Sequence, residues 1–234
     1  MKLILARHGN TFAPGDKVTW VGSANDLPLV ESGLEQAERA ASALEGTNLA
    51  AIYCAPLLRT KKFAEIIATK QAAKQATNRS AKSQSNQASQ PIIDKRLTEL
   101  DYGDWSGLSD DEIATKFGDS LKNWIDSSTW PSGCHWASSE AEVTAEVQEL
   151  VSELEEKHAD ETVLLVSSNG RLRYFLKLIA GEFERRVADK QFKMGTGKIS
   201  VLNGDGGVYS LLSWNEDPRS ENVLCQLTSP LTRP

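Results

Sequence analysis

The chain has 234 residues, of which 40% are hydrophobic and 25% are charged. This length and composition are typical of a globular protein that can bury one sizeable core. The formal net charge of −6 argues against a general nucleic-acid-binding surface, which would be basic, but it allows a few converging arginines to bind a small anion.

Short apolar runs alternate with helical patterns along the first part of the chain. Residues 3–6 predict a buried strand, after which comes a loop rich in glycine, proline and aspartate. Ser32 and Glu35 have the spacing of a capping box, which predicts that a helix begins there. Residues 49–54 predict the second strand, and Pro56 suits the first turn of the helix that follows.

The middle of the chain changes in composition twice. The stretch at about 70–90 has no large apolar residue, so we expect a polar insertion whose latter half is a solvated loop. Residues 91–93 predict a short strand. The segment at about 99–137 has four of the six tryptophans and several glycines, and we interpret it as a loop on the substrate side. Ser139 and Glu142 form a second capping-box pattern, which predicts a long helix.

The last part of the chain repeats the alternation. Residues 163–166 predict a strand, and residues 170–179 predict the helix after it. Residues 198–202 and 208–214 flank a glycine-rich turn, which is typical of a hairpin. This alternation predicts an α/β fold, a three-layer sandwich in which helices cover both faces of a mostly parallel sheet. We expect a single domain over residues 1–234.

Three polar segments follow predicted strands, where ligands of such sheets bind. They are residues 7–11, 55–60 and 167–170. Each has an ordinary interpretation by itself. A lone histidine is more often a surface or core residue, an arginine in a first helical turn is usually solvated, and serine or asparagine before a helix is usually a cap.

Together, these segments resemble the histidine phosphatase superfamily of phosphoglycerate-mutase-like proteins. Residues 7–11, Arg-His-Gly-Asn-Thr, resemble the family's Arg-His-Gly-Glu-Thr, and residues 55–60 resemble its Ser-Pro-Leu-x-Arg-Ala. Residues 97–107 match Leu-x-Glu-x-x-x-Gly-x-Trp-x-Gly, and residues 26–37 resemble a further motif between the first two. The motifs come in the family's order and span nearly the whole chain, which argues against chance agreement.

The resemblance implies a role for each matched residue. His8 would attack phosphorus and become a phosphohistidine, which water then hydrolyses. Arg7 and Arg59 would hold the phosphoryl oxygens, because guanidinium groups match phosphate in shape and charge. Glu99 would be the general acid for the leaving oxygen and then the base for water; its ordinary alternative is a surface carboxylate. Since arginines supply the charge, the resemblance implies no metal and no cofactor, with phosphate or sulfate bound in the pocket.

The chain departs from the family at the fourth motif. The family's Ser-His-Gly-Gly-x-Ile-Arg aligns with residues 167–173, which read Ser-Ser-Asn-Gly-Arg-Leu-Arg. Ser168 stands where the second catalytic histidine belongs, and Asn169 replaces a glycine. Both side chains can donate a hydrogen bond to phosphate, but neither carries the charge of a protonated histidine. The difference between a charged and an uncharged hydrogen bond corresponds to a rate loss of roughly ten- to a hundredfold.

Three further residues are candidates for the rim of the pocket. Asn10 and Thr11 follow the first histidine directly. His135 lies in the tryptophan-rich segment and could replace the lost histidine from a loop; the ordinary interpretation is a rim residue packed among tryptophans. The rim candidates are therefore Asn10, Thr11 and His135.

These residues predict a phosphomonoesterase that acts on a small-molecule or peptide phosphate ester. The alternative is a pseudoenzyme that binds a phosphorylated ligand, although such a binder would have little use for Glu99. A mutase, and a scaffold built on the tryptophans, are less favoured. The loops decide the substrate, so the motifs do not identify it. We expect no nucleic-acid or membrane partner and a cytoplasmic location, since the three cysteines are scattered and no stretch has the length of a signal peptide or membrane span.

Overall fold

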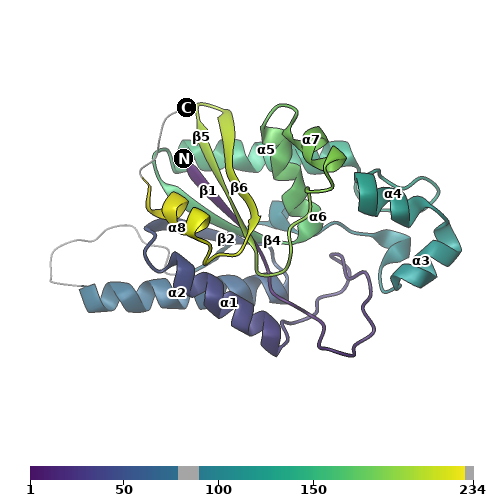
Figure 1. Ribbon diagram of the computed structural model, residues 1–234, viewed down its shortest axis with the longest axis horizontal. Coiled ribbons are helices and arrows are strands. Elements are labelled where there is room, and N and C mark those ends of the chain that lie inside the picture. Colours follow the sequence, from purple (N-terminus) through teal and green to yellow (C-terminus); the bar gives the residue numbers. More distant parts are fainter. Residues whose placement is uncertain (79–89, 230–234) are drawn as a thin grey trace.

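A computed structural model describes residues 1–78 and 90–229 of the chain (Figure 1). Its central sheet has six strands, of which the first four in spatial order are parallel and the last two form an antiparallel hairpin. The order is β3 (Ile92–Ile93), β2 (Leu49–Cys54), β4 (Thr162–Ser167), β1 (Lys2–Arg7), β5 (Ile199–Asp205) and β6 (Val208–Glu216). The predicted mostly parallel sheet is confirmed.

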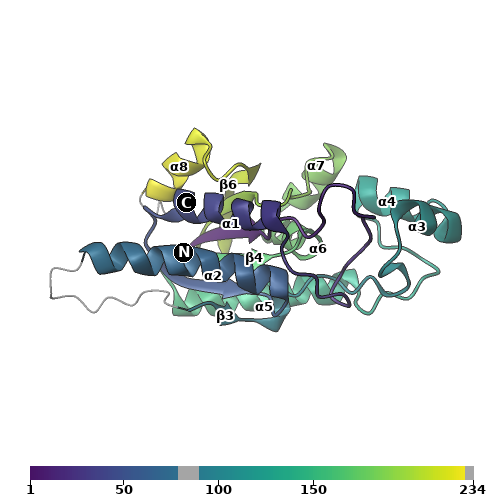
Figure 2. The same ribbon diagram turned by 90° about the horizontal axis from the view of Figure 1, so that it is seen from below.

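Helices cover both faces of the sheet, which confirms the three-layer sandwich (Figures 1 and 2). Successive residues of β1 point to opposite faces, so Leu3 and Leu5 join one core while Ile4 and Ala6 join the other. The second core is covered by α1 (Glu31–Leu44), α2 (Leu58–Asn78) and α8 (Glu221–Thr228). The first is covered by α5 (Glu140–Lys157), α6 (Asn169–Leu172), the 3-10 helix η3 (Arg173–Leu178) and α7 (Glu182–Ala188).

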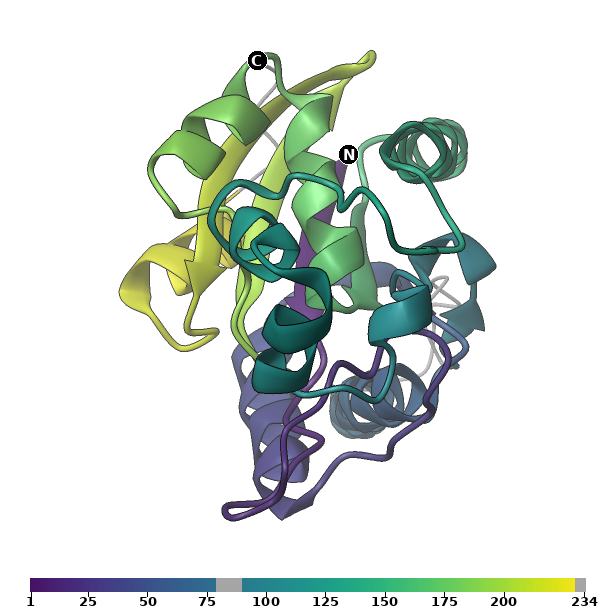
Figure 3. The same ribbon diagram turned by 90° about the vertical axis from the view of Figure 1, so that its right-hand side faces the viewer.

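Two short helices stand at the carboxyl end of the parallel strands, beside the loop that follows β1 (Figures 1 and 3). They are α3 (Asp110–Phe117) and α4 (Ser120–Ser127), and two 3-10 turns, η1 (Lys95–Leu97) and η2 (Gly103–Trp105), precede them. The amino-acid sequence predicts a loop over the whole segment of about residues 99–137. That prediction is wrong for α3 and α4, because helices of eight residues are too short for a periodic pattern to be distinctive.

Several predicted elements are confirmed at their ends. Ser139 and Glu142 form the expected reciprocal capping box at the start of α5. The hairpin of β5 and β6 turns at Gly206 and Gly207, whose φ angles are +57° and +82°. Two adjacent positive φ angles suit the tight turn that matches the twist of the strands.

The expected capping box at Ser32 and Glu35 is wrong. Helix α1 begins at Glu31, its N-cap is Val30, and no side chain caps it. Ser32 lies within the first turn, where its hydroxyl accepts a hydrogen bond from Asn10. The helix predicted over 170–179 is also only partly α-helical, since α6 gives way to the 3-10 geometry of η3.

The described residues include part of the predicted polar insertion. Helix α2 continues into it as far as Asn78, whereas residues 79–89, the predicted solvated loop, lie outside the described residues. Within residues 1–78 and 90–229, no helix combines the length and the apolar character that crossing a membrane requires.

Candidate active site

A cavity of about 520 Å³ opens beside the ends of β1 and β4. The loop after β1, helix α3 and the start of α6 all contribute to its wall. Most of the candidate residues line it, namely Arg7, His8, Asn10, Thr11, Arg59, Glu99 and Asn169. Motifs that are distant in the sequence therefore meet at one place.

The loop that carries His8 is held by close backbone packing. A Cβ atom on Gly9 would overlap the backbone of Gly33, and a Cβ on Gly33 would overlap that of Asn10. Glycine is therefore required at both positions. The backbone N–H of Asn10 donates to Gln36 (2.7 Å), and its side-chain oxygen accepts from the Thr196 hydroxyl (2.6 Å). Asn10 thus closes the loop against α1.

His8 is buried, with 6% of its surface exposed, and is held in one tautomer. Its Nδ1 lies 2.7 Å from the carbonyl oxygen of Gly9, which can only accept, so Nδ1 carries the proton. Burial lowers the pKa of His8 well below 6.5, and the charges of Arg7 and Arg59 lower it further. The ring is therefore neutral at pH 7, and Nε2 keeps a free lone pair.

Two arginines flank this imidazole. Arg59 is buried and donates to the carbonyl oxygens of Gly22 (2.6 Å) and Asn25 (3.1 Å), which fixes its guanidinium. Arg7 donates to the carbonyl oxygen of Met194 (2.5 Å), while its buried Nε has no hydrogen-bond partner among the described residues. Burial lowers the pKa of both arginines below their usual values, and the charge of Glu99 opposes this. The Nε–H group of Arg7 is thus a hydrogen-bond donor that a bound anion could satisfy.

Glu99 lies at the first turn of α6. Its Oε1 accepts from the backbone N–H groups of Leu100 (2.8 Å) and Arg171 (3.1 Å), and its Oε2 accepts from that of Gly170 (3.1 Å). The carboxylate therefore caps the helix from outside and satisfies N–H groups that would otherwise lack partners. It is buried and lines the cavity, unlike the surface carboxylate of the ordinary interpretation.

Ser168 and Asn169 have different surroundings. Ser168 is 1% exposed, its hydroxyl has no partner among the described residues, and it does not line the cavity. Asn169 does line the cavity, and its side-chain oxygen accepts from the backbone N–H of Met194 (2.8 Å). Because the Met194 carbonyl also binds Arg7, Asn169 helps to hold that arginine in place.

His135 lies outside the cavity. Its side chain is 97% exposed and faces Asp104, whose Oδ2 is 3.3 Å from the histidine Nδ1. It is neither packed among the tryptophans nor among the residues that line the cavity. In this structure the His135 ring does not take the place of the missing second histidine.

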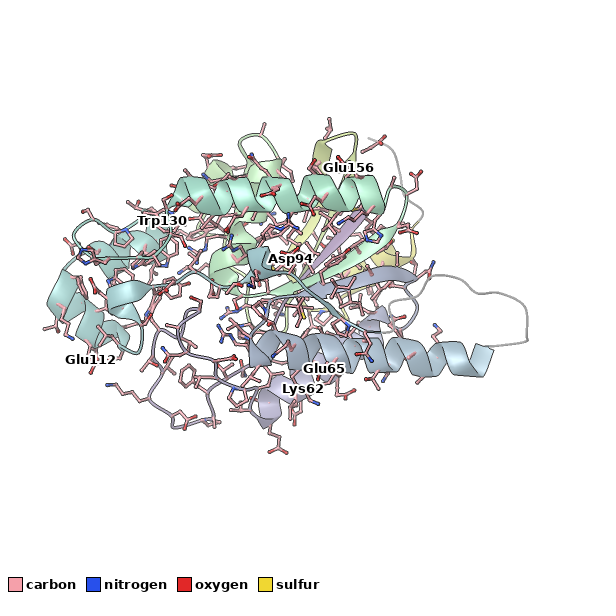
Figure 4. The ribbon with its side chains drawn as sticks, turned by 180° about the vertical axis from the view of Figure 1, so that it is seen from behind. Lys62, Glu65, Asp94, Glu112, Trp130 and Glu156 are labelled. Carbon is pink, nitrogen blue, oxygen red and sulfur yellow. The ribbon has the colours of Figure 1, made fainter. Side chains whose placement is uncertain are left out.

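The loop after β1 forms the outer wall of the cavity and is tied to α3. The indole Nε1 of Trp20 donates to Asp110 (2.7 Å), and Lys17 pairs with Glu112 (2.8 Å), which Figure 4 marks on α3. These wall residues belong to no recognisable motif, so the sequence gives no signal for them. Tyr102 also lines the cavity, and it could have been found from the sequence because it lies inside the matched motif of residues 97–107.

The charges of the cavity come from few side chains. Its cationic residues are Arg7 and Arg59, and Asp110 adds a negative charge to the outer wall. Within residues 1–78 and 90–229, no three or more histidine, cysteine, aspartate or glutamate side chains are grouped so that they could hold a metal ion. The arrangement suits an anion bound by guanidinium groups next to a neutral imidazole.

Comparison with known proteins gives a family and a fold. The family model of the histidine phosphatase superfamily (branch 1) matches residues 3–217. Phosphoserine phosphatase 1 of Hydrogenobacter thermophilus is 29% identical over 175 residues, which are 74% of this chain and 73% of that protein.

Solved structures share the fold over nearly their whole length. A mycobacterial glucosyl-3-phosphoglycerate phosphatase with inorganic phosphate has a TM-score of 0.73 at 24% identity, with 94% of this chain and 99% of that chain covered. The alpha-ribazole phosphatase of Shigella flexneri has a TM-score of 0.67 at 21% identity, with 93% and 97% covered. Since the family model matches almost the entire sequence, the chain belongs to branch 1 of the histidine phosphatase superfamily and is an enzyme of the histidine phosphatase type.

Proposed function

We propose that this enzyme is a phosphomonoesterase that transfers the phosphoryl group of a small-molecule or peptide phosphate ester first to His8 and then to water. One observation carries the proposal. A buried neutral imidazole with a free Nε2 shares a cavity with two arginines and a fixed carboxylate. A nucleophile, anion-binding groups and an acid–base group are the parts that such a reaction needs.

The first step breaks the ester bond. The Nε2 lone pair of His8 forms a bond to phosphorus while the bond from phosphorus to the alcohol oxygen breaks, and that oxygen takes a proton from the Glu99 carboxyl group. Arg7 and Arg59 bind the non-bridging oxygens, whose negative charge they offset. The free Nε of buried Arg7 supports this role, because a bound oxygen would give it an acceptor.

The second step releases phosphate. The Glu99 carboxylate takes a proton from a water molecule, whose oxygen attacks phosphorus as the bond from phosphorus to Nε2 breaks. His8 then regains its neutral form. Because the arginines supply the charge that the transferring group requires, we propose that neither a metal nor a cofactor takes part. We also propose that the enzyme works in the cytoplasm.

Residues of the fourth motif complete the proposed site. The Ser168 hydroxyl is buried without a partner, which is consistent with a donor that a ligand or a small movement would satisfy. The oxygen of Asn169 is already occupied by Met194, so only its NH₂ group remains to donate to phosphate.

The test is a panel of phosphate esters, assayed for released phosphate with wild type and His8→Ala. We expect turnover of at least one ester and a loss of about a thousandfold or more in His8→Ala, since the nucleophile is removed. Equal activity of the two proteins would refute the role of His8. A folded wild type that binds phosphate and hydrolyses no ester would favour the pseudoenzyme.

A further inference from the structure

Tyr102 is a residue of the cavity wall that the two proposed steps do not use. The residue is 6% exposed and lines the cavity together with Arg7 and His8. A hydroxyl group in a cavity wall can donate one hydrogen bond to a bound ligand.

The hydroxyl lies beside Glu99. A Cβ atom on Gly170 would be 2.5 Å from Tyr102 Oη and closer still to Glu99 Oε1, so both oxygens approach the same point at the first turn of α6. Glu99 is the proposed proton donor to the leaving oxygen. A ligand oxygen near this carboxylate is therefore also near the tyrosine hydroxyl.

Aromatic neighbours fix the direction of the ring. Trp20 and Trp136 contact it edge-on, with ring centroids 4.9 Å and 5.0 Å away. On the side of the loop, a Cβ on Gly22 would be only 2.9 Å from the Tyr102 ring. With its ring held between these neighbours, the hydroxyl loses little further conformational freedom on binding a ligand.

The phenol keeps its proton in this environment. Burial raises the pKa of Tyr102 well above 10, and the charge of Glu99 raises it further, while Arg173 and Arg7 act in the opposite direction. Tyr102 is therefore a neutral donor at neutral pH. It differs in this respect from a histidine, which donates with a charge only when protonated.

We propose that Tyr102 Oη donates a hydrogen bond to an oxygen of the phosphoryl group, on the side of Glu99, and so supplies a donor in place of the missing second histidine. This inference rests on the proposed function. Tyr102 is favoured over Ser168 because Tyr102 lines the cavity and Ser168 does not. The proposed hydrogen bond to the phosphoryl group makes Tyr102 a catalytic residue of the proposed reaction.

The test compares Tyr102→Phe with Tyr53→Phe and Ser168→Ala. Tyr53 is also buried, but its hydroxyl lies 3.1 Å from His158 and outside the cavity, so Tyr53→Phe is a matched control for loss of a hydroxyl. The readouts are kcat/KM for p-nitrophenyl phosphate and inhibition by orthovanadate, which mimics the five-coordinate transition state. The aromatic ring is kept in Tyr102→Phe, and the melting temperature checks its fold.

We expect Tyr102→Phe to lower kcat/KM by about ten- to a hundredfold and to weaken vanadate inhibition by a similar factor, as for one hydrogen bond to a charged group. Tyr53→Phe should stay within about twofold of wild type, and Ser168→Ala should lose less than Tyr102→Phe. If Tyr102→Phe is also within about twofold in both assays, or if Ser168→Ala loses more, the inference is overturned.

Failure of the proposed function gives a different result. If His8→Ala still hydrolyses the ester, the phosphohistidine proposal fails, but vanadate binding still reports on Tyr102. If His8→Ala is inactive and Tyr102→Phe is unchanged in both assays, only the role of Tyr102 is lost.

Discussion

Replacing Glu99 by glutamine separates its proposed chemistry from its contacts with α6. The structure gives the carboxylate three backbone donors, from Leu100, Gly170 and Arg171. A glutamine oxygen can keep two of them, whereas its NH₂ group would face the third N–H and leave it unpaired. That loss is worth about 1–3 kcal/mol, so we expect the melting temperature to fall by several degrees.

The catalytic loss should depend on the leaving group. Without a general acid, an alkyl phosphate should lose about a hundred- to ten-thousandfold in kcat/KM, since its alkoxide leaves poorly without a proton. An ester of p-nitrophenol, whose anion is a good leaving group, should lose far less. The measurement is the ratio of kcat/KM for the two esters in wild type and Glu99→Gln.

Glu146→Gln provides the control, because Glu146 pairs with the side chain of Arg171 and does not line the cavity. It should leave the ratio of the two esters unchanged. If Glu99→Gln also leaves this ratio of kcat/KM values unchanged, and its lower activity is explained by a smaller folded fraction, Glu99 acts only as a helix cap. That result would refute our assignment of Glu99 as the proton donor.

Four other outcomes follow from the site. Because the pKa of folded His8 lies below 6.5, the unfolded chain binds this proton first as pH falls, so stability should decline below about pH 6.5; in melting curves from pH 7 to 5, His8→Gln should lose less. Ser168→His combined with Asn169→Gly should raise turnover about tenfold, most strongly below pH 7, through one charged donor; lower activity would instead mean a site rebuilt around the present residues. EDTA should leave turnover unchanged, and a loss restored by magnesium or zinc would contradict an arginine-only site. Esters with a carboxylate near the phosphate should have kcat/KM about three- to tenfold below neutral analogues, because Asp110 places a negative charge on the outer wall and, among the described residues, the cationic side chains of the cavity are Arg7 and Arg59; equal rates would refute this.

The family resemblance predicted most of the residues that line the cavity, though not that Ser168 is left out, because its motifs follow strands whose carboxyl ends lie side by side. The β1 and β4 strands pair from Lys2 with Thr162 to Arg7 with Ser167, and this register brings His8 next to the fourth motif. The central strands were predicted closely for a similar reason, since a run of buried apolar residues leaves few alternatives to a strand in a parallel sheet. The sheet and the gathering of the motifs were therefore predictable.

Contacts between side chains of distant segments were not predictable. Nothing in the sequence indicates that Glu99 accepts hydrogen bonds from the first N–H groups of α6. Ser168 is the N-cap residue of that helix, but its hydroxyl makes no capping hydrogen bond. His135 is a candidate because of its residue type and its place in the tryptophan-rich segment, whereas the structure leaves its side chain 97% exposed to solvent. Tyr102 lay within a matched motif, but only the folded structure places its hydroxyl beside Glu99.

The most direct test of the central claim is to trap the phosphoenzyme. Wild type mixed with excess p-nitrophenyl phosphate should be quenched within milliseconds in alkali, in which phosphohistidine survives, and digested for mass spectrometry. The account predicts one added phosphoryl group on the peptide that contains His8, and none in His8→Ala under the same conditions. Hydrolysis of the ester with no phosphoryl group on His8 at any quench time, or the group found on another residue, would contradict it.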